Sequence, residues 1–144
     1  MVCNHSLVPA TALDPMLCFA VYSAERRIGQ IYREELAPWG LSYTQFIVLI
    51  ALWTEGPITV GRMGELVGLD SGTLSPLIQR LERRGFVQRT RSSADERVVT
   101  VASTASGDAL RDELADVPRC VALRFGVTAE QAEALVGELA AIAR

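Results

Sequence analysis

Lysine is absent from this chain and histidine occurs once, so all 14 of its fixed positive charges are arginine guanidinium groups. A planar guanidinium suits two-pronged contacts with phosphate and guanine, although the arginine bias of a GC-rich genome is the simpler explanation. His5 is the single histidine, and no glycine-rich phosphate loop occurs. Because metal and nucleotide sites depend on such groups, we expect neither a metal nor a cofactor.

Long apolar runs are also lacking. The longest covers residues 46–53, far short of the roughly 20 residues that cross a bilayer. No basic segment precedes an apolar stretch at the N-terminus, so no signal peptide is expected. Three cysteines, an odd number without framework spacing, fit a reducing compartment better than a secreted scaffold. We therefore expect a soluble cytoplasmic protein that does not associate with membranes.

Positive charge is concentrated in one segment although the whole chain is acidic, with 14 basic and 17 acidic residues. Residues 71–97 hold six arginines and three acidic residues, whereas the rest holds eight arginines and 14 acidic residues. The distribution of charge, more than its sum, indicates where a polyanion binds. This segment is therefore the candidate DNA-binding surface.

At 144 residues, 49% of them hydrophobic, the chain is long enough for one domain with a packed core. Residues 1–13 show no periodicity and are expected to form a flexible lead to a single domain over 14–144. Apolar residues spaced by three and four predict a long helix over 14–37. The other predicted elements are helices over 42–56, 59–68 and 70–85, strands over 86–91 and 97–102, a helix over 104–125 kinked at Pro118, and a helix from Thr128 onward.

The terminal helices carry apolar stripes that the central segment, which has its own core, cannot cover. Pairing with a second copy is the simplest way to bury them, and it predicts a two-fold symmetric dimer. The helices over 14–37 and 104–144 would then form the dimer, and residues 42–102 would form the DNA-binding part. The two-fold axis would also duplicate the DNA-binding part.

The turn after Gly68 and the helix that follows have the form of a helix-turn-helix. Short hydroxyl side chains in the first turn of this helix can approach bases and phosphates closely, and its N-terminus attracts phosphate. The candidate DNA contacts on it are Ser71, Thr73, Ser75, Gln79 and Arg80. Taken alone, the same pattern fits a capped amphipathic surface helix equally well.

The charged hairpin that follows favours DNA binding. Arg89 and Arg91 precede a polar turn that ends in Asp95-Glu96-Arg97. An arginine at the tip of such a wing suits the negative potential of a minor groove, and Asp95 could hold its guanidinium in place. A charged hairpin tip alone is usually just solvated. Helix, turn, helix and wing in this order predict a mainly α-helical winged helix-turn-helix protein with a small β-hairpin wing.

The stretch DSGTLSPLIQRLERRG over 70–85, followed by Asp95-Glu96-Arg97, resembles the MarR family of winged-helix repressors across nearly the whole chain. Within that family, Leu17-Cys18-Phe19-Ala20, Tyr32, and the LSYTQF motif over 41–46 are similar to the organic hydroperoxide sensors called OhrR. The resemblance implies a six-helix protomer and a homodimeric repressor. It also implies that oxidation of the cysteine releases operator DNA.

The residues themselves favour a sensing role for Cys18, although most buried cysteines are merely small hydrophobes. Tyr22 shares its helix face, whereas Tyr32 lies roughly 21 Å further along the axis. Antiparallel crossing of two such helices would bring Tyr32 and Tyr43 beside the partner's Cys18, where phenolic hydroxyls could activate a thiolate. Apolar neighbours such as Phe19 suit an organic peroxide, which would convert the thiolate to a sulfenic acid.

In some members of the family that this chain resembles, a second, distal cysteine resolves the sulfenic acid to an inter-subunit disulfide. Cys120 lies in about the right region, and the alternative is a core cysteine of the dimer helices. Cys3, in the N-terminal lead, is given little weight.

Two rival functions remain open at this level. One keeps the fold, and the repressor releases DNA on non-covalent binding of a phenolic or other small aromatic ligand, with Cys18 incidental. The other is a thiol peroxidase that uses Cys18 and Cys120. Against an enzyme, the chain lacks a thioredoxin-like βαβ pattern and any CxxC motif, and the wing would have no purpose.

Overall fold

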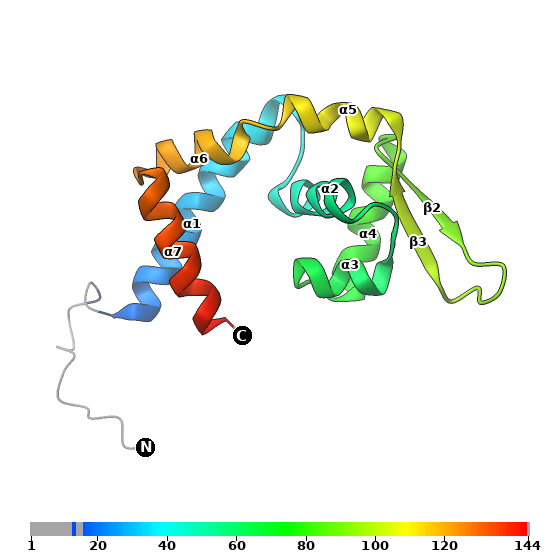
Figure 1. The fold of residues 1–144 in the computed structure, drawn as a ribbon, viewed down its shortest axis with the longest axis horizontal. Coiled ribbons are helices and arrows are strands. Elements are labelled where there is room, and N and C mark those ends of the chain that lie inside the picture. The colour runs from blue at the N-terminus through cyan, green and yellow to red at the C-terminus, as the bar shows by residue number, and fades with distance from the viewer. Residues whose placement is uncertain (1–12, 14–15, 144) are drawn as a thin grey trace, which may run out of the picture.

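The computed structural model describes residue 13 and residues 16–143, and most of them form helices (Figure 1). The predicted N-terminal lead therefore lies almost entirely outside the described residues. In chain order the elements are α1 (Leu17–Leu36), the 3₁₀ turn η1 (Ala37–Trp39), α2 (Tyr43–Glu55), β1 (Ile58–Thr59), α3 (Val60–Val67), α4 (Ser71–Arg83), β2 (Val87–Arg91), β3 (Val99–Ser103), α5 (Ala105–Glu113), α6 (Val117–Phe125) and α7 (Ala129–Ile142).

Side-chain caps begin several helices where the sequence predicts them. Ser42 and Gln45 form a reciprocal capping box at the start of α2, and Thr128 and Gln131 form another at the start of α7. The Thr59 hydroxyl accepts the backbone N–H of Arg62 in the first turn of α3. Each cap satisfies a donor that the helix itself leaves unpaired. The predicted starts of these helices are confirmed.

The small sheet holds three antiparallel strands in the order β1-β3-β2. The hairpin of β2 and β3 pairs Val87 with Ser103 and Arg91 with Val99, and it forms the predicted wing. The two-residue strand β1 adds to the free edge of β3 by pairing Ile58 with Val101. Sequence patterning did not anticipate β1, because two residues are too few to show alternation.

The single helix predicted over 104–125 is interrupted. It ends as α5 at Glu113 and restarts as α6 at Val117. Pro118 lies in the first turn of α6, where its missing N–H is harmless. The expected kink at this proline is thus a break in the helix just before it.

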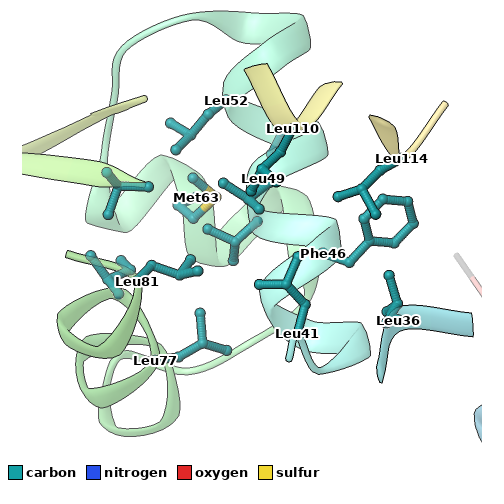
Figure 2. Close-up of a cluster of buried hydrophobic side chains, with 14 of the residues drawn as sticks. Leu36, Leu41, Phe46, Leu49, Leu52, Met63, Leu77, Leu81, Leu110 and Leu114 are labelled. Carbon is teal, nitrogen blue, oxygen red and sulfur yellow. The ribbon is translucent and has the colours of Figure 1, made fainter. Parts of the chain in front are cut away.

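The elements divide into a head, formed by α2, α3, α4 and the sheet, and an arm, formed by α1, α6 and α7 (Figure 1). Helix α5 runs between them. One buried cluster continues from the head to the end of α1, so that Leu36, Phe46 and Leu114 lie beside one another in Figure 2. Replacing such a buried leucine by alanine typically lowers the free energy of unfolding by about 2–5 kcal/mol. This shared cluster therefore holds the head and the arm together.

Apolar side chains remain exposed on the arm. Helix α7 has no buried residue, and Leu17 and Ile142 are each 74% exposed. An apolar groove of about 610 Å³ runs between α1, α6 and α7.

In the described part of the chain no single helix is long and apolar enough to cross a membrane. The bent pair Leu17–Trp39 and Tyr43–Glu55, at 72°, meets that test by length and composition alone.

Candidate functional site

Helix α4 begins with a strong N-cap. One carboxylate oxygen of Asp70 accepts the backbone N–H of Thr73 at 2.9 Å, and the other accepts the Thr73 hydroxyl at 3.0 Å. These hydrogen bonds hold the pKa of the Asp70 carboxyl below its ordinary value. The Thr73 hydroxyl, a predicted DNA contact, is therefore engaged in fixing the start of the helix.

The two faces of α4 have different roles. Its buried face carries Leu74, Leu77, Ile78 and Leu81, which pack into the core of the head. Because side chains three and four residues apart share a face, the residues between these four buried side chains point outward. The predicted contacts Ser71, Ser75, Gln79 and Arg80 are all exposed. The helix thus offers a polar, basic face that is held from behind by packing.

The tip of the wing is shaped by side-chain contacts to its own backbone. The Ser92 hydroxyl accepts the backbone N–H groups of Ala94 and Asp95. Asp95 Oδ1 accepts the backbone N–H of Arg97 at 3.0 Å, so Asp95 contacts the amide of Arg97, where the sequence suggested its guanidinium. The turn therefore presents the exposed Arg97 side chain at the tip.

Arg89 ties the wing to α4. Its guanidinium lies 2.6 Å from Glu82 Oε2, and its backbone N–H donates to Glu82 Oε1 at 3.1 Å. The hydrogen bond from Arg89 lowers the pKa of the Glu82 carboxyl. Arg91, two residues further along β2, is exposed. Of the two predicted contacts on this strand, Arg89 thus has a structural partner.

A groove of about 430 Å³ separates α4 from the wing. Ser75 and Ile78 of α4 line one side, and Arg89 and Arg97 line the other. The groove joins two sets of predicted contacts, those on the helix and those on the hairpin. Its basic lining and its hydroxyl group are suited to a phosphate backbone.

The two described cysteines lie on different helices of the arm, and both are free thiols. Cys18 is exposed in the first turn of α1. Cys120 is half-buried on α6. In the described part of the chain, no group of three or more His, Cys, Asp or Glu side chains is arranged to hold a metal ion.

Tyr32 and Tyr43 lie together at the far end of α1 from Cys18. Their ring centroids are 4.6 Å apart. Burial, and next the neighbouring Tyr43, raises the pKa of the Tyr32 phenol. Its hydroxyl therefore stays protonated and can donate a hydrogen bond. Fourteen residues of helix put Tyr32 roughly 21 Å along α1 from Cys18, so the two residues do not meet within one protomer.

Arg26, which contacts Tyr22, was not identified from the sequence. Its guanidinium donates to the Tyr22 hydroxyl at 3.3 Å and lies 5.6 Å from the centre of the Tyr22 ring. Cys18, Tyr22 and Arg26 follow one another at intervals of four residues on the same face of α1. That spacing was visible in the sequence and would have indicated a cation on this face.

Comparison with known proteins yields transcriptional regulators. The family model of the transcriptional regulator SarA/Rot matches residues 30–114. The HTH-type transcriptional regulator TtmR of Methylorubrum extorquens is 41% identical over 91% of this chain and 67% of its own. The organic hydroperoxide resistance transcriptional regulator of Bacillus subtilis is 38% identical over 74% of this chain and 72% of its own. These relatives are regulators of transcription, and none is named as an enzyme.

Solved structures that resemble this chain include proteins bound to DNA. Reduced AbfR bound to DNA, 29% identical, superposes with a TM-score of 0.75 over 90% of this chain and 91% of its own. AbfR, from Staphylococcus epidermidis, is also known in an overoxidized form on DNA and in a disulfide form, at TM-scores of 0.74 and 0.67. A mutant of Escherichia coli MarR with operator DNA shares the fold, at 23% identity and a TM-score of 0.78 over 88% of this chain and 92% of its own. The chain therefore belongs to the MarR family of DNA-binding winged-helix transcriptional regulators and is of the same type as the organic hydroperoxide resistance regulator of Bacillus subtilis.

Proposed function

We propose that this regulator is a homodimeric repressor that binds its operator while Cys18 is reduced and releases it when an organic hydroperoxide oxidises Cys18. The observation that carries the proposal is the exposed free thiol of Cys18 in the first turn of α1. A relative named for organic hydroperoxide resistance supports it, as do the reduced, overoxidized and disulfide forms of AbfR.

The head supplies the DNA contacts in this proposal. Ser71, Ser75 and Gln79 face the major groove, and Arg97 enters the adjacent minor groove. The outward face of α4 and the exposed wing tip support this placement. Arg80 and Arg91 contact phosphates at the edges of the site, where guanidinium groups bind well.

The arm supplies the dimer. The support is the groove between α1, α6 and α7, together with an α7 that has no buried residue. A contiguous apolar surface of this kind marks an interface, and a second copy of the same arm is complementary to it. Sedimentation at micromolar concentration is expected to show a dimer, and Leu139→Glu should shift it toward monomer. A well-folded wild-type monomer would refute this.

The proposed step is a two-electron oxidation of Cys18 by the peroxide. The Cys18 thiolate attacks the outer oxygen of ROOH and becomes a sulfenic acid, while the O–O bond breaks and the alkoxide takes a proton from water to leave as an alcohol. Tyr32 and Tyr43 of the second subunit donate hydrogen bonds to the thiolate, and Tyr22 lies on the same face as Cys18. The Cys120 thiol then displaces hydroxide from the sulfenic sulfur, which yields a disulfide and water.

The test uses full-length protein and a duplex that the reduced protein selects from a random-sequence pool. Cumene hydroperoxide is expected to release the wild type, as followed by fluorescence anisotropy. Cys18→Ser should bind and stay bound, whereas Cys3→Ser, the matched thiol control, should behave as the wild type. Cys120→Ser should still respond but form no disulfide and over-oxidise more readily. If Cys18→Ser dissociates as readily as the wild type, the redox model is wrong.

A ligand-released repressor is the second candidate, and the arm groove favours it. The groove is predominantly apolar and includes Tyr32, so a small aromatic molecule would fit it. Titration of the same DNA complex with salicylate separates the two models. Release by salicylate in the Cys18→Ser variant would support the ligand model.

A further inference from the structure

The C-terminal end of α4 is held more firmly than its sequence suggests. Three consecutive residues, Arg84, Gly85 and Phe86, follow the helix and are here called the C-terminal anchor. Arg84 is the C-cap residue of α4, and its guanidinium carbon lies 4.7 Å from the centre of the Phe86 ring. Stacking on the ring keeps the guanidinium in one orientation.

The first set of contacts joins the anchor to the segment that follows α1, residues 37–40, here called the corner. The Arg84 guanidinium donates to the carbonyl oxygen of Gly40 at 2.8 Å and also to that of Trp39. Gly40 has a φ of 60°, which favours glycine, so this carbonyl geometry depends on the residue present. A forked donor on two successive carbonyls fixes direction as well as distance.

The second set of contacts joins the anchor to the start of α5. The Thr104 hydroxyl donates to the carbonyl of Gly85, and its backbone N–H donates to the carbonyl of Phe86 at 3.1 Å. Gly107 lies so close that a Cβ there would come within 2.0 Å of the Phe86 oxygen. Both chain connections between arm and head therefore meet at the anchor.

The corner itself is bound to the other end of α5. Trp39 Nε1 donates to Glu113 Oε2 at 2.7 Å, and Glu113 is the last residue of α5. Arg124 of α6 forms ion pairs with Glu34 and Glu35 in the last turn of α1. Cys120 lies one helical turn before Arg124 on the same helix. Contacts thus run from α6, which carries Cys120, through the end of α1 and the corner to the end of α4.

We propose that Arg84 is a positioning residue that couples the redox state of the arm to the orientation of α4. The inference rests on the proposed redox function, and it identifies the contact through which that signal reaches DNA. In the reduced protein, the forked contact of Arg84 with the corner holds α4 at the angle that fits DNA. A shift of α1 against α6 on oxidation moves the corner, and Arg84 makes α4 follow.

The test compares two neighbouring arginines in full-length protein. Arg84→Met removes the forked donor but keeps an apolar chain on Phe86. Arg83→Met, the matched control, removes the same charge from an exposed side chain that has no ion pair or side-chain hydrogen bond within the described residues. For each variant, operator Kd is measured reduced and after cumene hydroperoxide, with Cys18 oxidation checked by mass.

Arg83→Met should leave the oxidised-to-reduced Kd ratio as in the wild type, since any lost phosphate contact weakens both states equally. Arg84→Met should reduce that ratio by a factor of at least about five, which is the lower limit of typical allosteric coupling. Arg84→Lys, which keeps one donor, should fall between them. Equal ratios for Arg84→Met and Arg83→Met would overturn the inference alone, whereas a wild type that oxidation fails to release would overturn the redox function and the inference with it.

A second pair of variants covers the case in which Arg84→Met does not fold. Glu113→Gln keeps an oxygen that can accept the Trp39 N–H, and Glu113→Ala does not. The ratio should fall in Glu113→Ala and stay near the wild type in Glu113→Gln. If the two variants give the same ratio, the corner does not carry the signal.

Discussion

Arg97 offers a direct measure of how much the wing contributes to DNA binding. The side chain is exposed at a tip whose backbone is fixed by Ser92 and Asp95. Because the backbone of the tip is already fixed, only the Arg97 side chain has to be ordered when its guanidinium enters a minor groove. Arg97→Ala removes the charge and leaves the turn contacts, which involve only the backbone of Arg97.

The expected magnitude follows from two wings per dimer. A good groove contact contributes about 1–3 kcal/mol, so losing two costs at least about 2 kcal/mol, or roughly 30-fold in Kd. Each cation withdrawn from DNA also lowers the slope of log K against log salt by about 0.9, and two lower it by about 1.8. Both effects should appear together if Arg97 meets the polyanion.

Operator affinity measured from 50 to 300 mM salt, roughly the range over which counterion release dominates, gives both quantities in one experiment. The matched control is Arg119→Ala, because Arg119 is an exposed arginine of the arm whose ion pair, among the residues that the structure describes, is with Asp116, the N-cap residue of its own helix. It should leave the slope as in the wild type. An Arg97→Ala protein with wild-type affinity and slope would show that the wing tip does not contact DNA.

Two further predictions concern the stability of the fold. Gly107→Ala should destabilise the protein by about 2–3 kcal/mol, because the new Cβ would collide with the Phe86 carbonyl; Gly137→Ala, in open space on α7, should be neutral or stabilising by thermal denaturation. Asp70→Ala should lower the melting temperature at pH 7. Folding lowers the pKa of Asp70, so its contribution is fully present above the unfolded value of about 3.9 and is lost as pH falls through the folded value. A melting-temperature difference that persists at pH 2 would contradict this.

The head could be predicted from sequence because its signals are local. A capping residue lies three positions from the amide that it binds, as Ser42 and Gln45 do, and the core face of α4 repeats every three to four residues. The basic segment over 71–97 was equally visible, since charge needs only counting. These features identify the fold and the candidate DNA-binding surface.

The contacts of individual arginines could not be predicted in the same way. Arg84 binds backbone carbonyls more than forty residues away, and a carbonyl has no sequence signature. Arg89 pairs with Glu82 across the junction of α4 and the wing, which the sequence shows only as two opposite charges seven residues apart. Helix α6 packs against α1, a contact between distant segments that the sequence does not show.

The length of α4 gives the proposed coupling a mechanical basis, because a small movement at one end of the helix becomes a larger movement at the other. The helix has 13 residues, and Ser71 and Ser75, two of its proposed DNA contacts, lie toward the end opposite the anchor. At 1.5 Å per residue it is a rod of about 20 Å, so a tilt of about 10° about the anchor moves its far end by about 3.5 Å. A hydrogen bond of about 2.9 Å does not survive such a displacement. Under the proposed redox model, oxidation therefore needs to unfold nothing, because a shift of the corner that Arg84 contacts would be enough to move Ser71 and Ser75 out of the groove.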